Sequence, residues 1–99
     1  MDKLGLYIKT RVKRIWDDGI RNKNSKTGKY FKAKDIAECI KSDSLFVSDV
    51  KTYTGHKHDE LSKIVGIALK KIEGDSLDGY ELCSYVVDGG TAYRFVESE

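Results

Sequence analysis

The sequence has few cysteines and no long hydrophobic run. These two absences argue against a disulfide-rich secreted protein and against a membrane-spanning protein. Its 99 residues contain two cysteines, a usage that points to a reducing cytoplasm. No apolar stretch approaches the roughly 20 residues that span a bilayer. The N-terminal residues also lack the uninterrupted apolar stretch of a signal peptide. We therefore expect a cytoplasmic protein with no membrane partner.

The two cysteines, Cys39 and Cys83, each sit in an apolar stretch, which predicts buried free thiols because cysteine packs as a small hydrophobe. A disulfide between them stays an alternative, since its geometry cannot be read from a sequence. His56 and His58 add two potential zinc ligands, but the chain has neither a Cys-x-x-Cys pair nor the usual histidine spacing. We expect no metal and no cofactor.

No set of acid, base and nucleophile stands out along the chain, so the sequence does not predict an enzyme. Asp17 and Asp18 lie at the end of an expected helix, where solvated charges are common. The Gly28-Lys29 pair is followed by Tyr30 instead of Ser or Thr, which excludes a phosphate-binding P-loop. No small-molecule ligand is indicated.

Charge is distributed unevenly, although the net charge is only +2. Residues 1–34 hold eleven Lys and Arg against three Asp, whereas residues 35–99 hold seven basic and thirteen acidic groups. Such asymmetry within one domain suggests a polyanionic partner on one face. A solvated surface that happens to be basic is the alternative explanation.

Apolar spacing predicts an amphipathic helix over residues 3–18, with Gly19 as its C-cap. Leu6 and Tyr7 fall partly off its apolar stripe, which leaves a second surface that could contact another copy of the chain. Three basic residues are expected on its other faces: Lys9, Lys13 and Arg14. The stripe itself consists of Leu4, Ile8, Val12 and Ile15, extended by Trp16.

A polar loop is expected over residues 19–29, followed by a very short strand at residues 30–32 and a helix at Ala33–Ile40. Residues 48–53 predict a short helix ending at Gly55, with a strand as the alternative. The next helix ends at Gly74 and has two possible starts, near His58 or with Ser62 as N-cap. Its core stripe is Val65, Ala68, Leu69 and Ile72.

Gly66 lies inside this last helix, where glycine costs about 1 kcal/mol relative to alanine. The close approach of another backbone would explain a glycine there. Beyond the helix, residues 80–87 and 91–96 have β-strand composition and are joined by Asp88-Gly89-Gly90. Because such a turn supplies positive-φ residues, a hairpin is expected.

The segments KYFKAKDIAECI, SKIVGIALKKIEG and YELCSYVVDGGTAYRFV resemble the winged-helix family, a helix-turn-helix variant with an appended hairpin. Within them, Ser62, Gly66 and Leu69 match an opening seen in many prokaryotic DNA-binding helices. The resemblance covers residues 29–96 and is to small archaeal, other prokaryotic or viral transcriptional regulators. It departs in one place: about sixteen residues separate Ile40 from His58, where a compact turn has three or four. Either an extra element is inserted or the helix assignment is wrong.

The resemblance implies an α+β fold: one winged-helix domain over residues 1–99, with three or four helices and a C-terminal two-strand wing. It further implies that the helix near residues 62–72 enters the major groove of double-stranded DNA. Lysines would reach guanine or phosphates, Ile67 a thymine methyl, and Ser62 a phosphate at the helix N-terminus. The DNA-binding residues expected on this basis are Lys32, Lys34, Ser62, Lys63, Ile67, Lys70, Lys71 and Arg94.

The leading hypothesis is therefore a double-stranded-DNA-binding transcriptional regulator, with a homodimer through residues 3–18 as its suggested assembly. Acidic residues in and around the hairpin, such as Asp88, favour an alternative: a winged-helix adaptor that binds protein and not DNA. RNA binding is a third hypothesis, since Tyr30 and Phe31 could stack on bases. The basic residues before position 35 shift the expected contact toward the helix and the N-terminal third, with the wing mainly structural.

Overall fold

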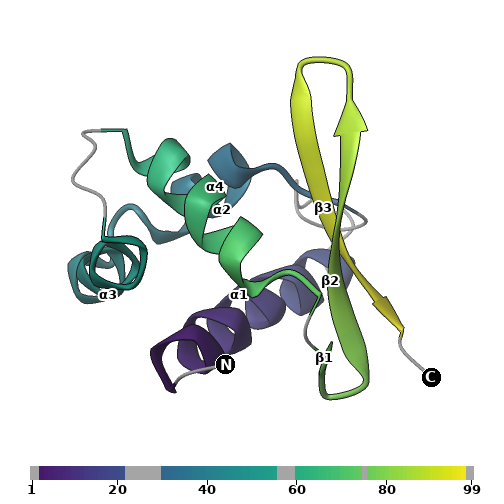
Figure 1. The fold of residues 1–99 in the computed structure, drawn as a ribbon, viewed down its shortest axis with the longest axis horizontal. Helices are drawn as coiled ribbons and strands as arrows, with labels where there is room; N and C mark the ends of the chain where they lie inside the picture. The colour runs from purple at the N-terminus through teal and green to yellow at the C-terminus, as the bar shows by residue number, and fades with distance from the viewer. Residues whose placement is uncertain (1–2, 22–29, 56–59, 75, 98–99) are drawn as a thin grey trace.

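The computed structural model describes residues 3–21, 30–55, 60–74 and 76–97, which form an α+β arrangement. Four helices lie to one side of a three-stranded antiparallel sheet, and its long hairpin projects past them (Figure 1). The elements in chain order are α1 (Lys3–Arg21), α2 (Ala33–Ile40), α3 (Ser44–Thr54), α4 (Leu61–Ile72), β1 (Ser76–Leu77), β2 (Tyr80–Val87) and β3 (Gly90–Glu97).

Helix α1 confirms the amphipathic helix and its apolar stripe, since Ile8, Val12 and Trp16 are buried. It continues through Gly19 to Arg21, so the prediction that Gly19 ends the helix is wrong. Of the three basic residues expected on the other faces of the helix, Lys9 and Lys13 are nevertheless buried, whereas Arg14 is exposed.

Each buried lysine has a partner that explains its position. The Lys9 ammonium donates a hydrogen bond to the carbonyl oxygen of Ile72, 3.1 Å away at the end of α4. The Lys13 ammonium lies 3.0 Å from an Asp17 carboxylate oxygen and 4.6 Å from the centre of the Tyr80 ring. In both residues the apolar methylene chain is packed inside the protein, and the ammonium group at its end has a polar partner, a carbonyl for Lys9 and a carboxylate for Lys13.

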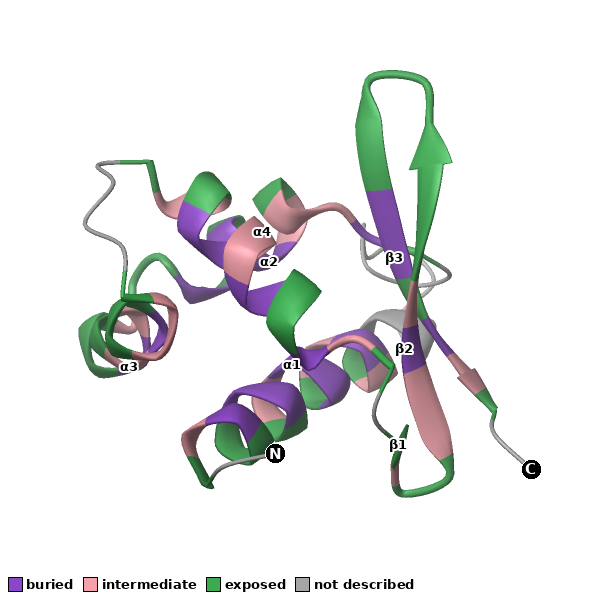
Figure 2. Cartoon of the chain, in the orientation of Figure 1, coloured by how far each residue is buried: buried purple, intermediate pink, exposed green. Residues whose placement is uncertain are grey.

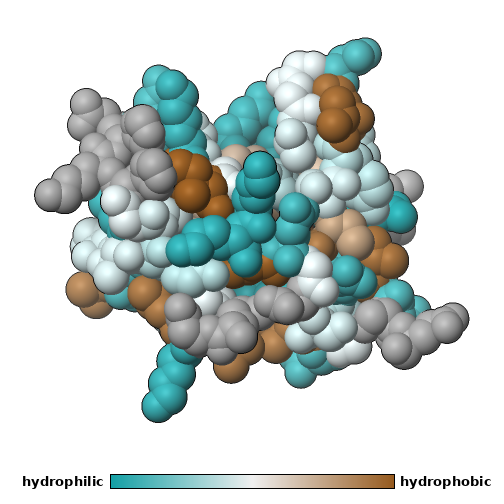
Figure 3. All heavy atoms as spheres, viewed as in Figure 1, coloured by the Kyte–Doolittle hydropathy of each residue, from teal (hydrophilic) through white to brown (hydrophobic). Residues whose placement is uncertain are grey.

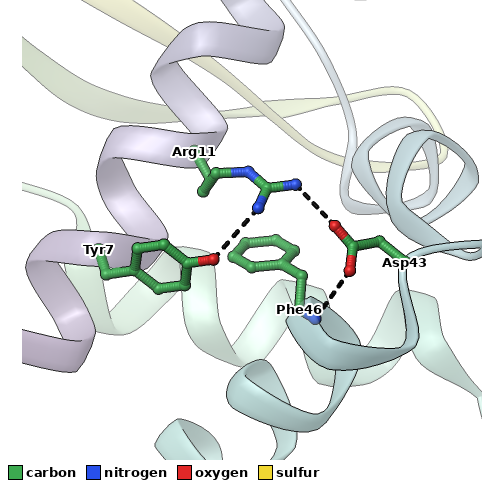
Figure 4. A network of polar contacts seen from close by, with 4 residues as sticks. All are labelled: Tyr7, Arg11, Asp43 and Phe46. Atoms are coloured by element: carbon green, nitrogen blue, oxygen red, sulfur yellow. Dashed lines mark hydrogen bonds and ion pairs between the residues drawn. The ribbon is translucent and has the colours of Figure 1, made fainter.

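Tyr7, on the second surface of α1, packs against α3 (Figure 4). Arg11 donates to the Tyr7 hydroxyl at 3.1 Å and to an Asp43 carboxylate oxygen at 2.9 Å, with its guanidinium 4.5 Å from the centre of the Phe46 ring. Asp43 also accepts from the Phe46 amide, which makes it the N-cap of α3. The Arg11 hydrogen bond, followed by that of Phe46, lowers the pKa of Asp43. The same bond to Asp43 raises the pKa of Arg11.

Helix α2 has the predicted bounds, and α3 confirms a helix in place of a strand before Gly55. Helix α3 begins earlier than expected, at Ser44 and not at Ser48. Gly55 caps it with a positive φ of 69°. Because α2 packs chiefly on α4, α3 is an extra helix inserted between two partners, which accounts for the long gap after Ile40.

Helix α4 buries the predicted stripe, and Ile64 in addition. Its N-cap is Glu60, so the prediction that Ser62 caps the helix is wrong; His58 lies outside the described residues. The explanation offered for Gly66 is also wrong. A Cβ at this glycine would meet the Ala33 side chain at 3.6 Å, an ordinary contact that leaves room for a methyl group.

The sheet confirms the hairpin and adds one short strand. β2 pairs with β3 in a register that joins Val87 to Gly90, so the turn consists of Asp88 and Gly89, and Gly90 already belongs to β3. β1, which the sequence did not predict, pairs with the base of β2. The expected strand near residue 31 is a single bridge: Phe31 and Tyr93 exchange two backbone hydrogen bonds, of 2.8 and 2.7 Å.

The core lies between the helices and the hairpin, where Figure 2 shows buried stretches in the middle of β2 and β3 and an exposed hairpin tip. Phe31, Phe95 and Trp16 meet there, with ring centres 5.3 Å apart for Trp16 and Phe95 and 6.3 Å apart for Phe31 and Phe95. Burial, and to a lesser degree Glu73, raises the pKa of Tyr93 in this region.

Both cysteines are free thiols, as predicted, but their predicted burial is wrong: Cys39 is exposed and Cys83 only partly buried. On α2 the inward positions are those of Ile36, Ala37 and Ile40. On β2 the inward neighbour is Leu82, and successive side chains of a strand alternate between faces. Among the described helices, none has both the length and the apolar character needed to cross a bilayer.

Candidate nucleic-acid interface

The outward face of α4 carries a stripe of positions left free by the core. Lys63 and Lys70 are exposed, and Gly66 and Ile67 are partly exposed between them. These positions are separated by three or four residues, so they share one side of the helix. The α4 stripe, as we call Lys63, Gly66, Ile67 and Lys70, therefore presents two ammonium groups around one apolar side chain.

The start of α2 borders this stripe. The Ala33 methyl group lies 3.6 Å from the position of a Cβ on Gly66, which brings the adjacent Lys32 and Lys34 beside α4. Lys34 is exposed, and Lys32 is partly exposed. The Lys32 ammonium lies 3.8 Å from where a Cβ on Gly89 would stand, so this side chain reaches the hairpin turn. α2, α4 and the turn thus meet on one face.

The first turn of α4 adds backbone donors to this face. Ser62 lies in that turn and is partly exposed. The N-cap Glu60 makes no side-chain capping bond, while its carbonyl accepts from the amides of Lys63 and Ile64 at 3.2 and 3.4 Å. A helix start with a free positive dipole suits a phosphate. The Glu60 carboxylate opposes it, although it lies 3.9 Å from the Lys63 ammonium and is partly neutralised.

Two expected DNA contacts are directed elsewhere. Lys71 donates to the carbonyl of Tyr53 at 2.9 Å, with its ammonium 4.4 Å from that ring, so it joins α4 to the end of α3. Arg94 alternates with the inward-facing Tyr93 on β3 and lies 5.2 Å from the centre of the Tyr85 ring. It therefore occupies the sheet face opposite the core, apart from the α4 stripe.

The basic N-terminal third contributes less to a surface than its composition suggested. Within α1, Lys9 and Lys13 are buried, and Arg11 is joined to Asp43. Lys3 and Arg14 are exposed. The remaining basic side chains before Lys32 lie outside the part of the chain whose side chains are described. Internal partners, not a polyanion, thus account for three of the α1 charges.

A hollow of about 340 Å³ lies between α1 and the β1–β2 turn, away from the α4 stripe. Its cations and carboxylates are mixed, and Lys13 in its wall is paired with Asp17. It therefore lacks the single sign of charge that attracts a polyanion. Its lining comprises Thr10, Lys13, Arg14, Asp17, Asp18, Leu77 and Asp78.

The described residues contain no group of three or more metal-ligating side chains, and His56 and His58 fall outside them. Of the two aromatics considered for base stacking, Phe31 is fully buried and Tyr30 is exposed. Comparison of the chain with family models, curated proteins and solved structures gives no match.

Proposed function

We propose that the chain is a winged-helix protein that binds double-stranded DNA and regulates transcription. The supporting features of the fold are the helix pair α2–α4, the Phe31–Tyr93 bridge and the C-terminal hairpin. In this proposal α3 is an insertion between the two helices of the pair. The hairpin then corresponds to the wing, and α4 to the recognition helix.

The observation that carries the proposal is the α4 stripe beside the start of α2. Lys63 and Lys70 would reach guanine edges or phosphates, and Ile67 would contact a thymine methyl. Lys32 and Lys34 would hold phosphates on one flank of the groove. The opposite side of α4 is buried in the core, so the helix has one free face to offer.

Fluorescence anisotropy with labelled duplex DNA tests this proposal. With four lysine–phosphate contacts, the logarithm of the association constant should fall against the logarithm of salt concentration with a slope of roughly −3 to −4. Replacing Lys63 and Lys70 by alanine should reduce both affinity and slope. Lys41→Ala is the matched control, because Lys41 is an exposed lysine paired with Glu38 at the far end of α2. No binding at low salt, or equal loss in the control, would refute the proposal.

An adaptor of the same architecture is the second candidate. It draws support from the hairpin tip, where Val86 is 93% exposed and Asp88 adds a negative charge. An adaptor should leave duplex DNA unbound even at low salt while retaining a protein partner in affinity capture. Any activation or repression of transcription would then depend on that partner.

A homodimer through α1 remains a proposal as well. Leu6 is 46% exposed there, whereas Tyr7 already contacts Phe46 within the chain, with ring centres 5.7 Å apart. Tyr7 is still 41% exposed, so α1 offers Leu6 and one part of Tyr7 to a second copy.

A further inference from the structure

The outer edge of β2 is covered at its base and open toward its tip. Tyr80 and Glu81 pair with β1, and the Gly74 amide donates to the Leu82 carbonyl at 3.0 Å. Beyond Leu82, no described residue forms a backbone hydrogen bond with this edge. The last part of β2 thus has β3 on one side only.

The backbone groups on this open edge follow from the hairpin register. In a hairpin closed by a two-residue turn, the closing pair, here Val87 and Gly90, is hydrogen-bonded, and such pairs alternate along the ladder. Ser84 and Val86 therefore direct their N–H and C=O groups away from β3. Leu82 lies two residues before Ser84, so its N–H and C=O groups point to the same edge. The hydrogen bond from the Gly74 amide to the Leu82 carbonyl agrees with this alternation.

The side chains at the edge are apolar and exposed. Val86 is 93% exposed, and Tyr85 and Val87 are each 36% exposed. Figure 3 shows hydrophobic atoms at the place where Figure 1 draws the hairpin tip. Natural edge strands avoid pairing through charged residues, proline or bulges. The five residues from 83 to 87, CSYVV, include none of these residue types, and their ladder with β3 is continuous.

We propose that this edge of β2 pairs antiparallel with the same edge of a second copy, so that the sheet continues across a two-fold dimer. A second copy is the matching occupant because a two-fold axis brings identical surfaces together, and every outward donor meets an acceptor of the same set. Ser84 and Val86 supply both kinds of group. The uncharged segment also meets an uncharged segment, whereas a charged strand would find no counter-charge on it.

Dimer formation would give a function to the hairpin tip, which the proposed DNA contact through α4 and α2 does not use. The Asp88 carboxylate at the tip opposes a phosphate backbone, but it tolerates a neighbouring strand in water. Pairing at the edge leaves the α4 stripe free. This inference does not rest on DNA binding, because association of the two copies is measured without DNA.

Sedimentation equilibrium of the full chain, from about 10 μM to about 1 mM, measures the dissociation constant of the dimer. Val86→Lys places like charges at the interface and should raise this constant by at least about tenfold. Thr91→Lys is the matched control: Thr91 is the partner of Val86 on β3, at the same height and on the same sheet face, but away from the β2 edge. It should dimerise as the parent chain does.

A second variant tests the backbone directly. Ser84→Pro removes an outward N–H that pairs with no described residue, and it should weaken the dimer while circular dichroism stays unchanged. Three results would overturn the inference: a monomer throughout the concentration range, equal loss with Thr91→Lys, or a dimer that Leu6→Lys dissociates and Val86→Lys does not. The last result would assign the interface to α1.

Discussion

Replacing the buried Lys9 separates two contributions that a lysine makes to stability. Its side chain is fully buried, and its ammonium donates to the Ile72 carbonyl at the C-terminus of α4. Lys9→Met keeps the apolar stem and removes the charge and the bond. Lys9→Ala removes both stem and bond. Comparison of the two substitutions assigns the cost to packing or to the polar contact.

The magnitudes follow from the contacts. The last carbonyls of a helix have no intrahelical donor, and leaving one without its partner in a buried position costs about 1–3 kcal/mol. A cation near a helix C-terminus adds about 0.3–1 kcal/mol. Release of the ammonium from a dry site offsets part of this, so we expect Lys9→Met to cost about 1–2 kcal/mol. Lys9→Ala adds the loss of about three buried methylene groups at roughly 0.8 kcal/mol each, for a total of about 3–5 kcal/mol.

Urea unfolding, followed by circular dichroism and by the fluorescence of the single tryptophan, Trp16, measures both variants. In a thermal melt of the same variants, each kcal/mol should lower the Tm by about 4–8 °C in a domain of this size. Lys3→Met serves as the control, because Lys3 is exposed on the same helix and should change stability by no more than about 0.5 kcal/mol. A Lys9→Met chain as stable as the parent would refute the reasoning, since the bond to Ile72 would then contribute no net stability.

Three further changes test other contacts. Gly66→Ala should raise the free energy of unfolding by about 1 kcal/mol, because the added methyl group meets Ala33 at an ordinary distance; a lower Tm would contradict this. Asp43→Asn keeps an N-cap and removes the ion pair with Arg11. Because the folded-state pKa of Asp43 is lowered, the Tm of the parent should exceed that of the variant at neutral pH, and this difference should disappear as pH falls below about 4. A difference in Tm that stays constant down to about pH 2 would argue against the ion pair. Cys39 should react with a thiol reagent in the folded chain but more slowly than a free thiol at pH 7, because partial burial of its sulfur and then nearby carboxylates raise its pKa; no reaction before unfolding would contradict its exposure.

The sequence predicted the elements whose pattern is local. The α1 stripe repeats every three or four residues, and the α2 bounds and the hairpin strands follow from spacing and composition. The exposed ends of the α4 stripe, Lys63 and Lys70, are likewise the complement of its buried positions. Periodicity determines which side of a helix faces inward, so it also predicts what faces outward.

Contacts between distant segments were beyond local patterns. The burial of Lys9 could not be predicted, because nothing near it in sequence indicates that Ile72, 63 positions away, offers a carbonyl. The engagement of Lys71 by Tyr53 depends on how α3 packs against α4. β1 has two residues, too few for any periodicity. A basic region therefore predicts a basic surface only after internal partners have been subtracted, and only tertiary packing identifies those partners.

The Phe31–Tyr93 bridge divides the hairpin into parts with different freedom of motion. Toward the base, Leu82 and Phe95 are anchored in the core, and the amides of the adjacent hydrogen-bonded pair, Cys83 and Arg94, should exchange slowly with deuterium. Toward the tip, beyond Thr91, no described residue outside the hairpin forms a backbone hydrogen bond with the strands, so picosecond-to-nanosecond fluctuations should grow with distance from the bridge. Lys32 follows Phe31 directly, so its backbone moves with the anchored part. A partner that binds to α2 and α4 next to the hairpin thus contacts rigid helices and a flexible hairpin tip. Only the hairpin tip can change its orientation to fit the partner.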